Sequence, residues 1–220
     1  ATDPNIYAHY SQEDKAGKAV NKQKLQERLC IEQNPDLPLV GMVTRLVSHK
    51  GLDLVKEGVD NVMEYSNAQF VVLGSGDWNY EQFFEQKLGW YPGRMALYRG
   101  YNEPLAMAIY SGADLLLMPS KSEPCGLAQM VAARYGTLPI VRETGGLKDS
   151  IHDMGGENGN GFTFKTYNAH DMLGAIRRAE GLFGNKPLWK EAMTDAMESD
   201  FSWKKSANDY VNVYRMILND

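Results

Sequence analysis

The sequence predicts an α/β protein with a parallel β-sheet that helices cover on both faces. Short apolar runs alternate with segments of helical periodicity through most of the 220 residues. The apolar runs are continuous, which is typical of strands buried on both faces of a parallel sheet. Unusual polar and glycine residues follow these runs, and open parallel sheets bind ligands at the carboxyl ends of their strands.

Each element is assigned from its pattern and its boundaries. We expect strands where apolar residues run together between turn-forming residues, at 38–46, 68–76, 94–101, 113–120 and 137–143. We expect helices where apolar residues recur with helical spacing, at 18–31, 51–65, 79–88, 103–112, 126–136, 168–183, 187–199 and 202–218. A glycine-rich segment ending near residue 164 precedes the C-terminal helices.

The composition argues against several classes of protein. The chain is 43% apolar and 23% charged, with a formal net charge of −5, as in ordinary globular proteins. It has no block of basic residues for nucleic acid, no apolar run near the roughly 18 residues of a membrane span, and no signal-peptide pattern. We expect a cytoplasmic protein in which Cys30 and Cys125 are reduced thiols, although one disulfide is possible. The histidines and cysteines show no metal-ligand spacing, so no metal site is expected.

Two loops carry charges that suit a phosphorylated ligand. Arg45 and Lys50 follow the first strand and precede a helix, and two cations beside a helix N-terminus favour an anion. The alternative is a pair of solvated surface cations. Glu123 follows the fourth strand, where it either complements a helix dipole or holds the hydroxyls of a sugar.

Other loops add candidate contacts. Gly74 and Gly76 form a Gly-x-Gly turn through which backbone can approach a ligand, but Asn79 breaks the dinucleotide-binding pattern. Tyr101 could stack on a base, although ordinary packing is more common. We expect Gly126 to start a helix and Cys125 to be a small buried packing group. We expect Gly145 and Gly146 to form a turn near the ligand-binding crevice at the carboxyl ends of the strands.

Four segments together resemble bacterial glycogen synthases and the related plant starch synthases. They are "RLVSHKGLDLV", "GYNEPLA", "PSKSEPCGLAQMVAARYGTLPIVRETGGLKDS" and "DFSW", in order through nearly the whole chain. The resemblance implies the C-terminal, Rossmann-like half of a glycosyltransferase B fold with a helical C-terminal tail. It also implies that the chain, which lacks an initiator Met, is a fragment without its N-terminal domain and is inactive alone.

The resemblance assigns three segments and a reaction. Residues 1–36 would be a polar and helical lead-in, 37–184 the nucleotide-sugar-binding domain, and 185–220 helices that pack toward the missing N-terminal domain. The enzyme would transfer glucose from ADP-glucose to the 4-OH at the non-reducing end of an α-1,4-glucan, with retention and without a cofactor or metal.

The resemblance also assigns roles to individual residues. Arg45 and Lys50 would neutralise the diphosphate, and Glu123 would contact the glucose and support charge on its anomeric carbon. The backbone at Cys125, Gly126 and Leu127 would meet sugar and phosphate, and Tyr101 would stack on adenine. Gly74, Gly76, Gly145 and Gly146 complete the expected donor site.

The sequence departs from close relatives at several positions. Thr44, Ser122, Ala128 and Glu143 replace residue types that are usual there. Val131 stands where many UDP- and GDP-sugar transferases place a second Glu, which favours the synthase family. A UDP-sugar enzyme of the sucrose-synthase type and a non-catalytic nucleotide- or glucan-binding module are the alternatives.

Overall fold

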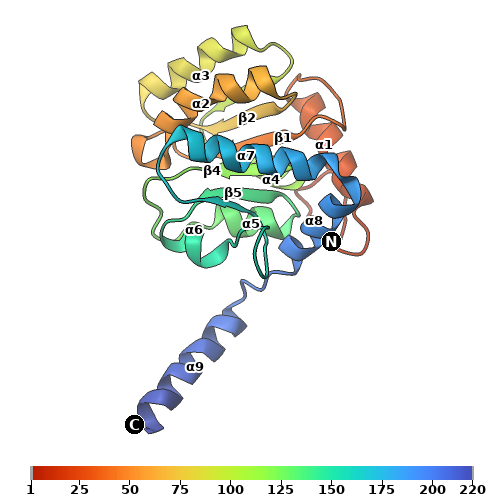
Figure 1. Ribbon diagram of the computed structural model, residues 1–220. Coiled ribbons are helices and arrows are strands. Elements are labelled where there is room, and N and C mark those ends of the chain that lie inside the picture. The colour runs from red at the N-terminus through yellow and green to blue at the C-terminus, as the bar shows by residue number, and fades with distance from the viewer. Residues whose placement is uncertain (1, 220) are drawn as a thin grey trace.

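A single six-stranded parallel sheet organises the chain. The computed structural model describes residues 2–219, and its strands lie in the order β3-β2-β1-β4-β5-β6 (Figure 1). Their bounds are β1 Leu39–Val43, β2 Gln69–Gly74, β3 Met95–Arg99, β4 Leu115–Met118, β5 Leu138–Arg142 and β6 Phe162–Phe164. The sheet reverses its winding direction between β1 and β4, which is the point where such sheets bind ligands.

Helices cover both faces of the sheet, as predicted. One face carries α2 (Leu52–Tyr65), α3 (Trp78–Trp90) and α7 (Ala169–Gly184). The other carries α1 (Ala16–Arg28), α4 (Glu103–Gly112), α5 (Ala128–Arg134) and α6 (Gly145–Ser150). The predicted parallel α/β architecture is confirmed.

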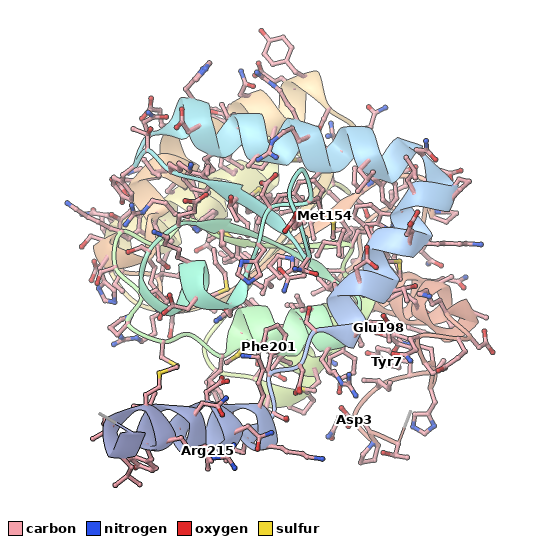
Figure 2. The ribbon with its side chains drawn as sticks, turned by 60° about the horizontal axis from the view of Figure 1, so that its bottom comes forward. Asp3, Tyr7, Met154, Glu198, Phe201 and Arg215 are labelled. Atoms are coloured by element: carbon pink, nitrogen blue, oxygen red, sulfur yellow. The ribbon has the colours of Figure 1, made fainter. Side chains whose placement is uncertain are left out.

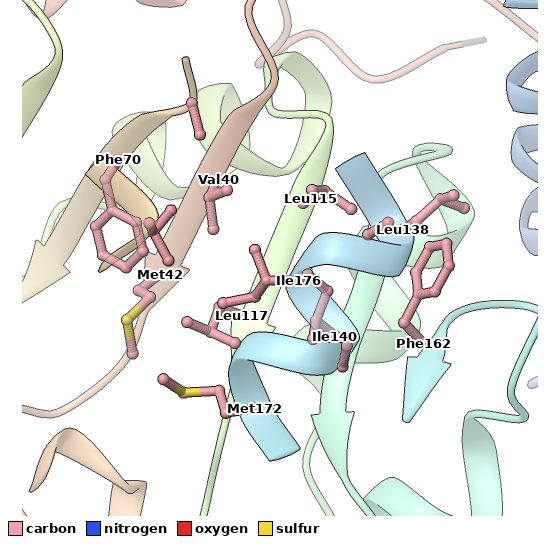
Figure 3. Packing of buried hydrophobic residues seen from close by; sticks show 14 of the residues in the cluster. Val40, Met42, Phe70, Leu115, Leu117, Leu138, Ile140, Phe162, Met172 and Ile176 are labelled. Atoms are coloured by element: carbon pink, nitrogen blue, oxygen red, sulfur yellow. The ribbon is translucent and has the colours of Figure 1, made fainter. Parts of the chain in front are cut away.

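Successive strand residues supply the two cores. Val40, Met42, Leu115 and Leu117 face α7, where Met172 and Ile176 complete the packing (Figure 3). Leu39 and Leu116, one position along the same strands, face the core under α1 and α4 instead. This alternation follows from the two-residue period of a strand.

Helix α1 attaches to the sheet largely through polar side chains. Lys22 forms a 2.7 Å ion pair with Asp114, whose carboxylate also accepts a 2.8 Å hydrogen bond from the Leu39 backbone N–H. Lys18 is buried and donates to Thr137 Oγ1 at 2.5 Å. Burial lowers the pKa of Lys18 to about 7, although the nearby Asp114 charge opposes the shift.

The two C-terminal helices lie differently. Helix α8 (Lys186–Glu198) buries Trp189, Ala192 and Met193 in the core beside α7. Helix α9 (Trp203–Asn219) stands away from the domain, beyond the link in which Figure 2 labels Phe201. None of the helices among residues 2–219 has the length and apolar character needed to cross a membrane.

Three local predictions were wrong. Strand β6 lies within the predicted glycine-rich segment, and α6 begins at Gly145, where the sequence predicts a turn. Helix α5 begins at Ala128, because Gly126 adopts a left-handed φ of 75° that precedes the helix. Gly126 is therefore the bend before the helix and not its first residue.

Candidate functional site

The loops after β1 and β4 bring two predicted site residues into direct contact. A single-turn 3₁₀ helix, η1 (Ser48–Lys50), presents Lys50, whose Nζ lies 2.5 Å from Glu123 Oε2. The hydroxyl of Ser120 donates to the same carboxylate oxygen at 3.1 Å. Only 17% of the Lys50 side chain and 10% of the Glu123 side chain are exposed. Glu123 and Lys50, which the sequence assigns to two separate loops, thus form one ion pair.

Backbone contacts hold these two loops together. The His49 carbonyl accepts hydrogen bonds from the Lys121 N–H at 2.9 Å and from the Ser122 N–H at 3.4 Å. Gly51, with a φ of 76°, precedes α2, and a Cβ at this position would overlap the Pro119 carbonyl. A glycine is thus required both by the conformation and by the close approach of the β4 loop.

The loop after β5 joins the same arrangement through its glycines. Gly146 N–H donates to the Glu123 carbonyl at 3.1 Å and to the Pro124 carbonyl at 3.3 Å. Side chains at Gly145 or Gly146 would overlap the carbonyls of Glu123 and Cys125, respectively. The structure therefore places Gly145 and Gly146 against the backbone that carries Glu123.

Gly74 and Gly76 serve a similar packing purpose beside β1. A Cβ at Gly74 would overlap the carbonyl of Thr44, and one at Gly76 would overlap the carbonyl of Leu46. The backbone N–H of Leu46 donates to the Ser75 carbonyl at 2.9 Å. This close backbone packing accounts for both glycines, and their contact with a ligand stays a prediction.

Arg45 and Tyr101 are exposed at the carboxyl edge of the sheet. Arg45 directly precedes the bridge between Leu46 and Gly76, and no described residue forms an ion pair with it. Tyr101 is 87% exposed, just before the Asn102 side chain that caps α4. Both side chains are accessible to a ligand, and neither contacts the Lys50–Glu123 pair through a described hydrogen bond.

The turn before α5 exposes the other predicted contacts. Cys125 is exposed, so the expectation of a buried packing group was wrong, because its side chain lies in the loop and not on the helix. Leu127 is 68% exposed. Cys30 and Cys125 are both free thiols, as expected.

Sequence reasoning missed Gln129, which stabilises this turn from inside. Its fully buried side chain donates from Nε2 to the Gly126 carbonyl at 2.9 Å and to Ser150 Oγ at 3.1 Å. A weaker contact reaches the Cys125 carbonyl at 3.3 Å. No motif indicates this role, since a glutamine in the first turn of a helix is ordinary.

Open space borders the same loops. A cavity of about 540 Å³ is lined by Cys125, Gln129 and Gly146, together with residues of the link to α9.

Among residues 2–219, no group of three or more histidine, cysteine, aspartate or glutamate side chains is arranged to hold a metal ion.

This edge combines a buried carboxylate with positive charge. Lys50 directly precedes the N-terminus of α2, whose free N–H groups favour an anion, and Arg45 is exposed in the same connection between β1 and α2. Glu123 provides a negative charge next to that region. A ligand with an anionic part and a hydroxyl-bearing part is the chemistry that such an edge can recognise.

Comparisons with known proteins identify the family of this chain. The family model described as "Glycosyl transferases group 1" matches residues 24–182. Curated glycogen synthases from Geobacillus thermodenitrificans and Bacillus cereus are 48% and 47% identical, over 98% and 99% of this chain. The chain spans about half the length of these relatives, 45% and 46%.

Solved structures show the same fold. The catalytic domain of starch synthase IV from Arabidopsis thaliana, bound to ADP and acarbose, matches 100% of this chain and 46% of its own, with a TM-score of 0.89 and 36% identity. A sucrose-phosphate synthase from Thermosynechococcus elongatus, at 20% identity and a TM-score of 0.64, matches 89% of this chain and 49% of its own, and shows the fold alone. The predicted half of a glycosyltransferase B fold is thus confirmed, and the chain belongs to the glycosyl transferase group 1 family.

Proposed function

We propose that this chain is the donor-binding half of a glycogen or starch synthase. The complete enzyme transfers glucose from ADP-glucose to the 4-OH at the non-reducing end of an α-1,4-glucan, with retention of configuration. The observation that carries the proposal is the Lys50–Glu123 pair at the carboxyl edge of the sheet. The 48% identity to a glycogen synthase and the structural match to a starch synthase bound to ADP support this choice of donor.

The reaction first requires that the leaving group be stabilised, and fixed cations can do this. Breaking a glycosyl phosphate bond leaves negative charge on the diphosphate, and preorganised positive groups lower the energy of that state. Arg45 is exposed and free to reach a phosphate, while Lys50 has further N–H donors beyond the one directed at Glu123. In this proposal the side chains and the start of α2 do the work, and no metal or cofactor is required.

The remaining candidate residues contact the sugar and the base of the donor. Glu123 contacts the glucose and stabilises positive charge at its anomeric carbon, while Tyr101, 87% exposed, stacks on adenine. Sugar and phosphate meet the backbone at Cys125, Gly126 and Leu127. In this proposal the backbone of the neighbouring loops, at Gly74, Gly76, Gly145 and Gly146, lines the same donor site.

Helix α9 supports the proposal that an N-terminal domain completes the enzyme. Its apolar residues Tyr210, Val213, Tyr214 and Ile217 share one face and are all at least 50% exposed. Trp203 at its start is 89% exposed. We propose that this face packs on the N-terminal half and that the glucan acceptor binds between the two halves. A cytoplasmic location completes the proposal, in keeping with two free thiols.

An activity assay on the full-length protein tests the proposal. The protein is incubated with a maltooligosaccharide and with ADP-glucose or UDP-glucose, and the lengthening of the glucan is followed. We expect elongation with ADP-glucose and a product that an α-1,4-specific glucosidase digests. Elongation with UDP-glucose alone would favour the UDP-sugar alternative, and no elongation with either donor would contradict the proposal.

A further inference from the structure

Arg142, at the carboxyl end of β5, binds the loop that carries Glu123. Its Nε donates to the Ser120 carbonyl at 2.8 Å, and its Nη2 donates to the Lys121 carbonyl at 2.6 Å. One planar guanidinium therefore fixes two consecutive carbonyls, which a lysine ammonium cannot do with the same geometry. The Ser120 hydroxyl in turn donates a hydrogen bond to the Glu123 carboxylate, so a shift of the loop would also shift the carboxylate.

Tyr167, in the segment after β6, covers this contact and extends it to a third element. Its ring centroid lies 5.5 Å from the Arg142 guanidinium carbon and 5.6 Å from Lys121 Nζ. Both distances allow cation–π attraction. Its hydroxyl donates to Asp53 Oδ1 at 2.5 Å, in the first turn of α2 and three residues after Lys50.

These contacts join the segments that carry Lys50 and Glu123, and neither Arg142 nor Tyr167 forms a described hydrogen bond with that pair. Arg142 fixes the β4 loop before Glu123, and Tyr167 links Arg142 to the helix that follows Lys50. The His49 carbonyl holds the same loop from the β1 side through the Lys121 N–H. Displacing the loop would move the Ser120 hydroxyl and the Glu123 carboxylate together.

We propose that Arg142 and Tyr167 are positioning residues that hold Glu123 in register with Lys50. The proposal rests on the glycosyltransferase function for its catalytic consequence, but its geometric content concerns this chain alone. The two side chains contact neither the sugar nor the phosphates. They fix the position of the Glu123 carboxylate, which contacts the sugar.

Arg94 offers a matched control at another loop. It also uses its guanidinium to bind backbone carbonyls, at Met63, Ser66 and Ala68, before the start of β3. Arg94→Lys and Arg142→Lys therefore remove the same kind of contact at opposite ends of the strands. If Arg142 has a merely structural role, Arg142→Lys and Arg94→Lys should have similar kcat values.

The first measurement is amide hydrogen exchange on this chain. In Arg142→Lys and in the milder Tyr167→Phe, we expect the amides of residues 120–123, which lie between two prolines, to exchange faster by about threefold or more, because the loop opens locally. In Arg94→Lys the faster exchange should appear around 63–68 instead. Unchanged exchange of residues 120–123 in both site variants would overturn the proposal, and Tyr167→Phe decides if Arg142→Lys does not fold.

The second measurement is steady-state kinetics of the full-length protein. We expect Arg142→Lys to lower kcat by about ten- to a hundredfold, because small misplacements of a catalytic group have effects of this size. The KM for ADP-glucose should change by less than about threefold, and Arg94→Lys should leave kcat unchanged. Equal kcat in both variants would overturn the positioning role. If the unsubstituted protein transfers no glucose, the proposed function fails, and the exchange experiment still tests the contact geometry.

Discussion

Replacing Glu123 by glutamine removes the negative charge of the candidate site with little change in shape. The carboxylate is 10% exposed and accepts from Lys50 Nζ at 2.5 Å and from Ser120 Oγ at 3.1 Å. Glutamine keeps one acceptor oxygen for these donors but cannot stabilise positive charge on the anomeric carbon as a carboxylate does. The substitution therefore separates the charge of Glu123 from its packing.

The expected loss follows from the strength of a hydrogen bond to a charged group. Such contacts are worth about 1.5–3 kcal/mol, so kcat should fall by roughly 10- to 150-fold if the charge acts in the transition state. Affinity for ADP should change by less than about fivefold, because ADP lacks the glucose that Glu123 contacts. Turnover should thus fall more than nucleotide binding.

Steady-state kinetics of the full-length variant and calorimetric titration with ADP measure the two quantities. Asp60→Asn is the matched control, since Asp60 accepts from Lys87 Nζ at 2.6 Å and from the Tyr91 hydroxyl at 2.8 Å, outside the candidate site. Asp60→Asn should leave kcat unchanged. Equal loss of turnover and ADP affinity in Glu123→Gln, or unchanged turnover, would refute a transition-state role.

Three further predictions concern the cations, the close-packed loops and a buried lysine. Lys50→Ala and Arg45→Ala should each weaken ADP binding by about 1.5–3 kcal/mol, because a charge-assisted contact is lost, and unchanged titration curves would contradict the anion site. Gly51→Ala should lower the unfolding free energy by more than about 1 kcal/mol, because its Cβ would overlap the Pro119 carbonyl. Gly174→Ala in α7, which has open space around it, should instead raise the unfolding free energy by about 0.5–1 kcal/mol. Denaturant unfolding measures both, and an equal effect of the two substitutions would refute the packing argument. The lowered pKa of Lys18, about 7, means that the unfolded chain binds an extra proton between about pH 7 and pH 10, so the unfolding free energy should rise with pH there by up to about 1.4 kcal/mol per unit. Lys18→Met should remove this rise, and an unchanged slope would show that Lys18 titrates normally.

The main architecture could be predicted because buried parallel strands have a simple signature. Continuous runs such as 68–76 and 113–120 identified β2 and β4, and glycine or proline marked their ends. Strand β6 has only three residues and follows several glycines, so no pattern distinguished it from the loop. Helix α6 begins with two glycines, which ordinarily disfavour a helix.

The candidate site was only partly predictable, because its contacts join distant parts of the chain. Position after a strand identified Lys50 and Glu123 separately, but their 2.5 Å contact spans 73 residues and depends on the adjacency of β1 and β4. The buried polar face of α1 was hidden for a related reason. Lys18, Lys22 and Gln26 resemble a solvated face until their partners in other elements are known.

Calorimetric titration of this chain with ADP, UDP and NAD tests the central claim most directly. The chain carries the residues proposed to bind the donor, namely Arg45, Lys50 and Tyr101, and its Lys50→Ala variant provides the control. We predict that ADP binds at least about tenfold more tightly than UDP or NAD, and that the Lys50→Ala variant binds ADP more weakly than the unsubstituted chain. Tighter binding of UDP or NAD, or ADP binding that Lys50→Ala leaves unchanged, would contradict an ADP-glucose site at this edge of the sheet.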